Sequence, residues 1–252
     1  MTRIIACVSG KGGAGKTTIA ANLGAALTEF GKDVVVLDAN LTTPNLGLHL
    51  GVPLYPTTLH DVLKGKAKIQ DAIYEHSSGL KIIPAGIALK DLKGVDVRGL
   101  SSAILDLLGN VDIVIIDAAA GLGREALAAM ECADELLLIT NPELTAVTDA
   151  LKAAKLAEQM GTKISGVVVN RVTGRKHELN RRDILRLLGD VELLAEVPED
   201  VAVQEAIAIR TPIVHHKPSS ISSREIRNLA SRLIGREVKA EIWYRKFFPF
   251  IR

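Results

Sequence analysis

The sequence predicts an α/β fold built on a doubly wound, mostly parallel sheet. Short apolar runs rich in Val, Ile and Leu recur at residues 4–8, 33–38, 111–120, 135–140 and 163–170. Runs of this kind are typical of parallel strands that are buried on both faces. An amphipathic stretch of helical period follows the first run at residues 19–30. Polar or glycine-rich loops follow several strand ends, which is where sheets of this class bind ligands.

Length and composition favour a single folded domain. The 252 residues, 48% of them hydrophobic, suffice for one large α/β domain. We expect this domain to span residues 1–236 and a short amphipathic tail to follow at 237–252. No apolar run reaches the roughly 18 residues of a membrane span and no signal peptide is evident, so we expect a cytoplasmic protein whose membrane contact is peripheral. A formal charge of +2 does not by itself indicate nucleic-acid binding.

A glycine-rich loop, G-K-G-G-A-G-K-T-T, joins the first predicted strand to the first predicted helix. Its glycines, with Asp38 downstream, also fit the G-x-G-x-x-G pattern of a dinucleotide site. Lys16 and Thr17 decide between the two motifs, because they complete G-x-x-x-x-G-K-[ST]. In that motif backbone N–H groups cradle phosphates, the lysine reaches the β- and γ-phosphates, and the hydroxyl ligates Mg²⁺. The predicted phosphate-binding residues are Gly10, Lys11, Gly12, Gly13, Ala14, Gly15, Lys16, Thr17 and Thr18.

Two of the predicted strands end in an aspartate, Asp38 and Asp117. The carboxyl ends of parallel strands meet at the ligand-binding edge, so we expect both carboxylates, with Thr17, at the Mg²⁺ site. For Asp38, a strand-end acid that caps the following turn is the alternative. Gly121 follows Asp117 at D-x-x-G spacing, which lets a glycine N–H sense a γ-phosphate. Asn40 can orient a water molecule, but its amide cannot accept a proton as a carboxylate does.

With its additional Lys11, the loop K-G-G-x-G-K-T-T resembles the deviant Walker A motif of the MinD/ParA family of P-loop ATPases. The resemblance covers about residues 2–234 and implies a three-layer α/β/α fold that binds ATP and Mg²⁺. It also implies hydrolysis of ATP to ADP and phosphate in a homodimer, in which Lys11 reaches the partner's nucleotide. A solvated loop lysine is the alternative. The expected catalytic residues are Lys11, Lys16, Asp38, Asn40 and Asp117.

The segments that contain Asp38 and Asp117 are similar to the family's switch I and switch II. The family usually has D-x-D in switch I, where this sequence has Asn40 in place of the second acid. Hydrolysis that is slower, or a water held differently, is the expected consequence.

Two further segments resemble the family's adenine site. A predicted strand ends at Asn170-Arg171, which looks like the family's N-R pair, whose carboxamide reads the adenine edge. Pro198, Glu199 and Asp200 end another predicted strand, and relatives lay this segment beside the base. Because the sequence has no N-K-x-D, we do not expect guanine recognition. An Asx turn is the alternative role for Asn170.

The remaining predicted elements carry no catalytic group. They are a short capped helix at 57–63, a strand at 80–84, a helix at 101–108, a helix that follows Asn141-Pro142-Glu143 and ends at Met160, and a last helix at 222–234. His215-His216 has no third ligand at metal spacing and is interpreted as a surface pair.

A basic cluster indicates one alternative function. Its members are Arg171, Arg175, Lys176, Arg181, Arg182 and Arg186, with Glu178 and Asp183 among them. ParA-type relatives bind the DNA backbone nonspecifically through such patches, which would make this chain a partition ATPase. A solvated helix face is the other interpretation, since no aromatic residues are interleaved.

The last residues carry an aromatic and basic pattern. On a helix, Trp243, Tyr244, Phe247 and Phe248 share one face, and the pattern resembles the C-terminal membrane anchor of MinD proteins. Two tails on an ATP-bound dimer could raise membrane avidity by ~10² to 10⁴. The resemblance thus implies an ATP-driven switch that positions cell-division or envelope machinery and answers to a protein activator. Packing of these aromatics on protein is the alternative.

The two cysteines, Cys7 and Cys132, form neither a CxxC pair nor a disulfide framework. Both suit small buried hydrophobes. A symmetric pair of Cys132 residues across a dimer could instead bind a cluster. An ATP-binding iron–sulfur or recruitment scaffold with little turnover is therefore a further alternative.

Overall fold

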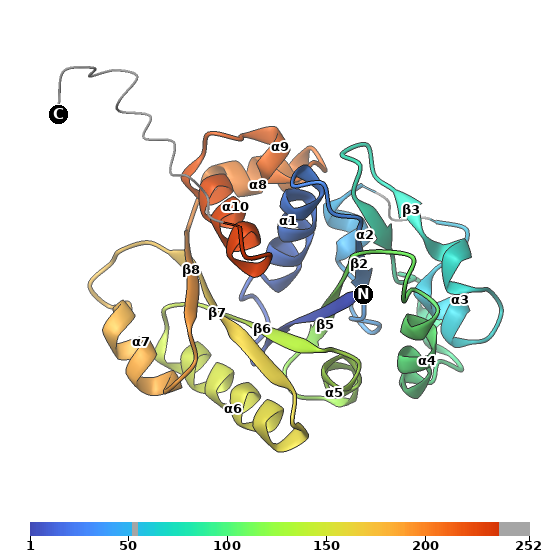
Figure 1. Ribbon diagram of the computed structural model, residues 1–252, viewed down its shortest axis with the longest axis horizontal. Coiled ribbons are helices and arrows are strands. Elements are labelled where there is room, and N and C mark those ends of the chain that lie inside the picture. The colour runs from blue at the N-terminus through green and yellow to red at the C-terminus, as the bar shows by residue number, and fades with distance from the viewer. Residues whose placement is uncertain (52–54, 237–252) are drawn as a thin grey trace.

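The computed structural model describes residues 1–51 and 55–236, and within them eight strands form one sheet (Figure 1). The strand order is β3-β4-β2-β5-β1-β6-β7-β8, and β3 is the only strand of these residues that runs antiparallel to its neighbour. The strands are β1 (Arg3–Ser9), β2 (Val34–Asp38), β3 (Tyr74–Glu75), β4 (Lys81–Ile83), β5 (Ile113–Ala120), β6 (Glu135–Thr140), β7 (Lys163–Val172) and β8 (Leu193–Pro198). The predicted doubly wound, mostly parallel sheet is confirmed.

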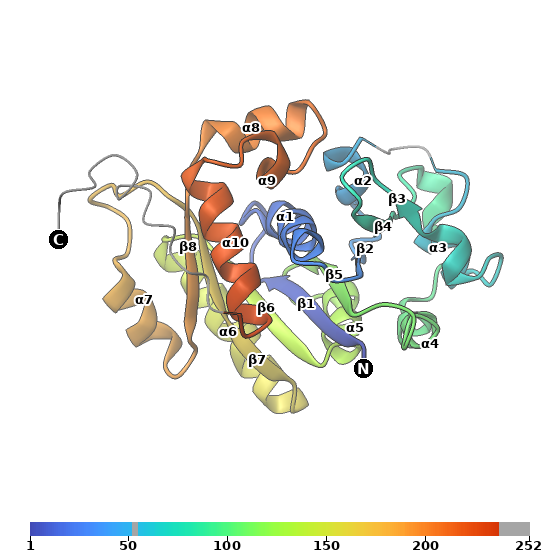
Figure 2. The same cartoon turned by 45° about the horizontal axis from the view of Figure 1, so that its top comes forward.

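Helices cover both faces of this sheet (Figure 2). Helices α1, α8, α9 and α10 lie on one face, and α5, α6 and α7 on the other. The helices are α1 (Lys16–Glu29), α2 (Leu46–His49), α3 (Leu59–Leu63), α4 (Leu100–Leu105), α5 (Arg124–Glu131), α6 (Leu144–Met160), α7 (Arg181–Leu188), α8 (Val201–Ala208), α9 (Ile213–His216) and α10 (Ile221–Leu233). Three short 3₁₀ helices are η1 (Ile69–Ala72), η2 (Leu89–Leu92) and η3 (Val97–Gly99).

Successive residues of the central strand face two different cores. Ile4, Ala6 and Val8 of β1 pack with the α5–α6 side, whereas Ile5 and Cys7 pack with the α1–α10 side. All five are buried. This explains why the central strands are continuous apolar runs and not alternating ones.

Most predicted elements are present with small shifts. Strand β7 continues past Asn170 to Val172, and α6 begins at Leu144, after Pro142. At the predicted cap of α3, the Thr58 N–H and hydroxyl both donate to Asp61 Oδ2, at 3.0 and 2.9 Å. Helices α2, α5, α8 and α9 were not predicted, because runs of four or eight residues are too short to show a clear period.

Helix α10 runs from the carboxyl-terminal ends of the strands to their amino-terminal ends. Near its start, the Ser222 hydroxyl donates to the carbonyl of Pro198, at the carboxyl end of β8, at 3.2 Å. At its end, the Arg3 guanidinium at the start of β1 donates to the carbonyl of Leu233. Arg236, the last described residue, therefore lies near the amino-terminal ends of the strands, whereas the glycine-rich loop lies at their carboxyl-terminal ends.

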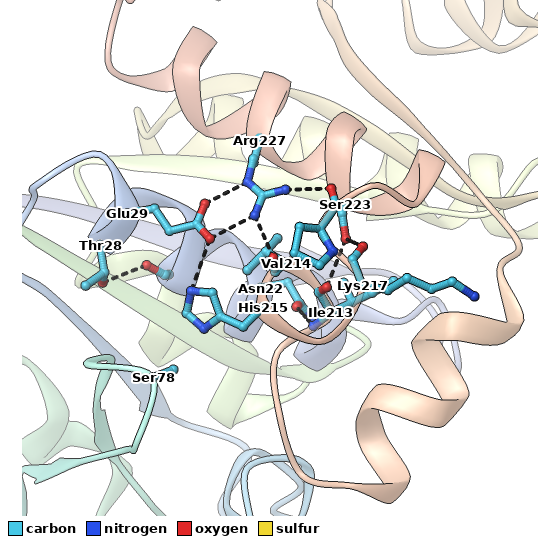
Figure 3. A network of polar contacts seen from close by, with 12 residues as sticks. Asn22, Thr28, Glu29, Ser78, Ile213, Val214, His215, Lys217, Ser223 and Arg227 are labelled. Carbon is cyan, nitrogen blue, oxygen red and sulfur yellow. Dashed lines mark hydrogen bonds and ion pairs between the residues drawn. The ribbon is translucent and has the colours of Figure 1, made fainter. Parts of the chain in front are cut away.

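A polar network joins α1 to α9 and α10 (Figure 3). Glu29 accepts hydrogen bonds from Arg227 Nε and Nη2 at 2.7 and 2.8 Å, and its carboxylate lies 3.1 Å from His215 Nε2. Asn22 Oδ1 accepts the Ile213 N–H at 2.6 Å. The surface interpretation of His215 is thus corrected, because its side chain is only 26% exposed and faces an acid of α1.

In the residues that the structure describes, no helix is long and apolar enough to cross a membrane. The tail at 237–252, with its four aromatic anchor residues, lies outside these residues. The domain boundary after residue 236 stays a prediction.

Candidate functional site

The glycine-rich loop lies between the central strand β1 and the buried helix α1. Gly15 precedes α1 with φ of 83°, a left-handed conformation that favours glycine. A Cβ at this position would lie 2.1 Å from Asn170 Nδ2. Position 15 therefore requires glycine for two reasons, the positive φ of its backbone and the close approach of the Asn170 side chain.

Lys16 begins α1 and is 7% exposed, and its Nζ lies 2.7 Å from Asp117 Oδ1. Asp38 and Asp117 are paired in register on β2 and β5, and both are fully buried. Burial, with the charge of Asp117, raises the pKa of Asp38 to about 7. Asp117 Oδ2 is buried and has no hydrogen-bond partner among the residues that the structure describes.

This acid pair fits the predicted metal. Two buried carboxylates lie on paired positions of neighbouring strands, one of them is paired with Lys16, and its second oxygen is the type of ligand atom that Mg²⁺ prefers. Thr17, the predicted hydroxyl ligand, lines a cavity together with Lys16, the partner of Asp117. Thr17, Asp38 and Asp117 are therefore the residues that would hold Mg²⁺, directly or through water.

Asp38 also caps the next element, as its alternative interpretation proposed. Its Oδ2 accepts the N–H groups of Asn45 and Leu46, both at 3.0 Å, and its Oδ1 accepts that of Asn40 at 3.1 Å. These bonds fix the start of α2 against the carboxyl end of β2. Capping and metal binding are compatible roles for one carboxylate, because each oxygen can accept more than one bond.

Asn40 is 8% exposed and shapes the loop that follows β2. Its Nδ2 donates to the Thr43 carbonyl, while its Oδ1 accepts from the Thr43 hydroxyl at 3.1 Å. Thr42, between them, donates through its N–H and hydroxyl to Glu125 at the start of α5. The two segments that resemble switches I and II are thus hydrogen-bonded to each other, beside a groove of about 310 Å³.

At the other end of the site, Asn170 Nδ2 donates to the Ala14 carbonyl at 2.8 Å. Arg171 bonds the Gly13 carbonyl at 3.3 Å and Glu199 at 2.8 Å. Asp200 Oδ1 accepts the Ala202 N–H at 2.9 Å and so caps α8. Asn170 therefore contacts the phosphate loop itself, and its role at the adenine edge stays a prediction.

A cavity of about 440 Å³ runs from the switch I side to the end of β8. Predicted site residues in its lining are Gly12, Gly13, Ala14, Gly15, Lys16, Thr17, Thr18, Asn40, Asn170, Arg171, Pro198, Glu199 and Asp200. Predicted site residues outside its lining are Gly10, Lys11, Asp38, Asp117 and Gly121. The prediction missed the lining residues His49, Val203, Gln204, Ile207 and Ile226, which belong to no motif.

Three of the residues outside the lining have other contacts. Gly10 packs so closely on α6 that a Cβ would lie 2.4 Å from the Asp149 carbonyl oxygen. The Gly121 N–H donates to the Ser9 carbonyl at 3.0 Å. Lys11 Nζ lies 3.5 Å from Glu143, and both side chains are more than half exposed, a weak pair that leaves the lysine accessible.

Three of the six members of the basic cluster are paired with acids. Arg171 contacts Glu199, Arg181 contacts Glu196 at 3.3 Å, and Arg186 lies 3.8 Å from Asp183. These pairs support the interpretation of α7 as a solvated helix face.

The cysteines are free, as predicted: Cys7 is buried in β1, and Cys132 follows α5. Burial raises the pKa of Cys132 to about 11, which disfavours the thiolate that binds metal. No group of three or more His, Cys, Asp or Glu side chains in the described part of the chain could hold a metal ion.

A phosphate loop between a central parallel strand and a buried helix, with its lysine beside strand-end carboxylates, is the architecture of P-loop NTPases, and this chain is one of them. The family model described as ParA, NUBPL iron-transfer P-loop NTPase, matches residues 1–234. The chain therefore belongs to the ParA family, whose members are typically ATPases.

Its relatives include proteins named for septum placement. The chain is 43% identical to an uncharacterised ATP-binding protein of Methanocaldococcus jannaschii, over 98% of this chain and 93% of that protein. It is 34% identical to the septum site-determining protein MinD of Thermotoga maritima, over 96% of this chain and 91% of that protein. The structure of MinD from Pyrococcus horikoshii complexed with Mg-ADP matches with a TM-score of 0.89 and 39% identity, covering 92% and 96% of the two chains. The resemblance to the MinD/ParA family is confirmed.

Proposed function

We propose that this chain is a Mg²⁺-dependent ATPase that pairs with a second copy when ATP is bound and separates after hydrolysis. The observation that carries this proposal is the arrangement of its two loop lysines. Lys16 is buried beside the strand-end carboxylates, whereas Lys11, in the same loop, is 52% exposed and available to another molecule.

In the proposed cycle, each residue has a separate task. Backbone N–H groups of the loop bind the phosphates, and Lys16 leaves Asp117 to neutralise the terminal phosphates. Bound Mg²⁺ would neutralise charge on the phosphate oxygens. Asn40 orients the attacking water, and Lys11 of each copy stabilises charge on the other copy's nucleotide. Because no described acid takes the place of the family's second switch I acid, slow intrinsic hydrolysis is expected.

The cellular role is proposed from the relatives named MinD. The protein would be cytoplasmic and bind the inner face of the membrane through its tail, with Trp243, Tyr244, Phe247 and Phe248 as anchors. It would place cell-division or envelope machinery and respond to a protein activator. Pairing supports this role physically, because two weak anchors on one dimer bind far more tightly than one.

The central experiment measures particle mass by light scattering with Mg-ATP and with Mg-ADP. Asp117→Ala serves to slow turnover, and Lys11→Ala is compared with wild type for both mass and phosphate release. We expect a dimer with ATP only, and we expect Lys11→Ala to bind nucleotide but stay monomeric. ATP-driven pairing and turnover that survive Lys11→Ala would overturn the proposed switch.

A second experiment tests the membrane role separately. Wild type and a chain truncated after residue 236 are pelleted with anionic liposomes in ATP and in ADP. We expect ATP-dependent pelleting of the full chain only, and equal pelleting of both lengths contradicts the anchor. Retention on DNA that is lost on charge reversal at Arg181 and Arg182 would instead favour the partition ATPase, and a coloured sample without turnover would favour the iron–sulfur scaffold.

A further inference from the structure

Helix α2 places one histidine at the wall of the nucleotide cavity. The helix is held at its start by the two N–H bonds to Asp38 Oδ2, and Leu46 and Leu50, at 0% and 3% exposure, fix its inner side in the core. Leu48 points outward and is 48% exposed. His49, the next residue, is partly buried and lines the cavity together with Thr17 and Thr18 of the phosphate loop.

The ring of His49 has unused hydrogen-bonding capacity. Among residues 1–51 and 55–236, none forms a hydrogen bond or ion pair with this imidazole, and neither ring nitrogen is fully enclosed. Burial lowers the pKa of His49, and the charge of Asp117 acts in the opposite direction. His49 and Lys16 line the same cavity.

We propose that His49 is a positioning residue that donates a hydrogen bond to the phosphate chain of the bound nucleotide. An imidazole has at least one N–H donor in either protonation state, and a polyphosphate offers only acceptors. Because Asp38 holds both α2 and the metal side of the site, the contact would tie the position of α2 to the presence of phosphates. This inference rests on nucleotide binding as proposed above.

The test measures dissociation constants for Mg-ADP and for Mg-tripolyphosphate, which lacks ribose and base. We compare wild type with His49→Phe, which removes the donor, and His49→Gln, which retains one. Leu48→Gln is the matched control, because this neighbour on α2 lies outside the cavity lining. We expect His49→Phe to weaken both ligands on the order of tenfold, His49→Gln to recover part of that loss, and Leu48→Gln to change neither.

A ring signal separates contact from mere structural support. On wild-type protein labelled with ¹⁵N at histidine, the ring nitrogens of His49 should shift on addition of Mg-tripolyphosphate. Unchanged affinities in His49→Phe, loss for Mg-ADP but not tripolyphosphate, or an unshifted ring each overturn the inference. If wild type itself binds neither ligand, the proposed function fails as well, so the two failures are distinguishable.

Discussion

The carboxylates of Asp38 and Asp117 are both fully buried on neighbouring strands, and Lys16 at the end of the phosphate loop forms an ion pair with Asp117. The pKa of Asp38 is raised from 3.8 to about 7, so the folded protein holds this proton more tightly than the unfolded chain does. The corresponding stability is therefore present at low pH, below the unfolded value, and is lost as the pH rises towards 7. Above this pH the nucleotide-free protein is destabilised, because the charged Asp38 is buried beside the charged Asp117.

The substitution Asp38→Asn tests this electrostatic cost. The Asn side chain keeps an oxygen that can cap α2 but does not titrate. The stability of the variant should therefore lack the fall with pH that the ionisation of Asp38 causes in wild type. Between about pH 5 and about pH 8, without Mg²⁺ or nucleotide, wild type should lose roughly 2–3 kcal/mol more unfolding free energy than the variant. Urea denaturation at both pH values measures this difference. Parallel pH profiles would contradict it.

Gly15 gives a prediction about the backbone. Gly15→Ala adds a Cβ at positive φ that would overlap the Asn170 amide, so both the loop and its neighbour must move. We expect a loss of more than about 2 kcal/mol of unfolding free energy, with weaker nucleotide binding. Gly31→Ala is the matched control, because Gly31 has φ of 78° with nothing within 4 Å of its added Cβ. It should cost only about 1 kcal/mol, and equal losses would refute the steric argument.

At this scale the sequence predicts some side chains well and others poorly. Lys16 and Thr17 follow from a motif whose spacing is local, and the structure places both at the cavity. Asn170 lines the cavity as well, but the sequence does not indicate the bond from its amide to Ala14, which lies 156 residues away. His49 belongs to no motif, and the cap at Asp38 with the burial of Leu46 and Leu50 brings it to the site. Contacts between distant segments leave no local signal in the sequence.

Among the elements, α1, α9 and α10 depend on the Glu29 and Arg227 pair for part of their packing. Arg227 also donates to the Val214 carbonyl at 2.5 Å and to the Pro218 carbonyl at 2.8 Å, so one guanidinium joins three segments (Figure 3). Both charged side chains are only about a quarter exposed. The pair is therefore less screened than an ordinary surface ion pair.

Arg227→Ala should therefore lower the free energy of unfolding by about 1–3 kcal/mol, since it leaves a partly buried carboxylate and two carbonyl groups without their donor. Arg224→Ala is the control, because Arg224 lies on the same helix and is exposed. Its change should stay within about 0.5 kcal/mol. Chemical denaturation measures both, and similar values for the two arginines would show that the network contributes little.

Helices and strands were predicted well where they are long enough to show their hydrophobic period in the sequence. The long α6 and the strand β6 were predicted almost to the residue, because each carries its full pattern locally. The four-residue helices α2 and α9 were not, since tertiary bonds to Asp38 and Asn22 fix their starts. For such short helices, position depends on a partner elsewhere in the chain.

For the whole molecule, nucleotide binding should appear as added stability. A ligand that binds only the folded state at about 100 times its Kd adds ~2.7 kcal/mol, so Mg-ADP should raise the melting temperature of wild type. Lys16→Ala should show little of this rise, because its cation is missing from the phosphate site. Thermal melts with Mg-ADP, and with ADP plus EDTA, check both points. An equal rise in Lys16→Ala would contradict the assignment of the loop.

The fold class was predictable because five apolar runs already imply a parallel sheet with two buried faces. The order of the strands was not, since it depends on which edges meet in space. The antiparallel β3, two residues long, carries no pattern of its own. The family resemblance predicted the phosphate loop and the strand-end acids, whereas lining residues such as His49 and Val203 are set by tertiary packing.

Helix α10 carries the chain from the carboxyl end of β8 to the amino end of β1, so Arg236 lies at the opposite end of the strands from the phosphate cavity. A fluorophore or a surface tether coupled there should leave nucleotide entry unobstructed. Single-molecule recordings of immobilised protein could then follow ATP arrival and departure without steric interference from the support.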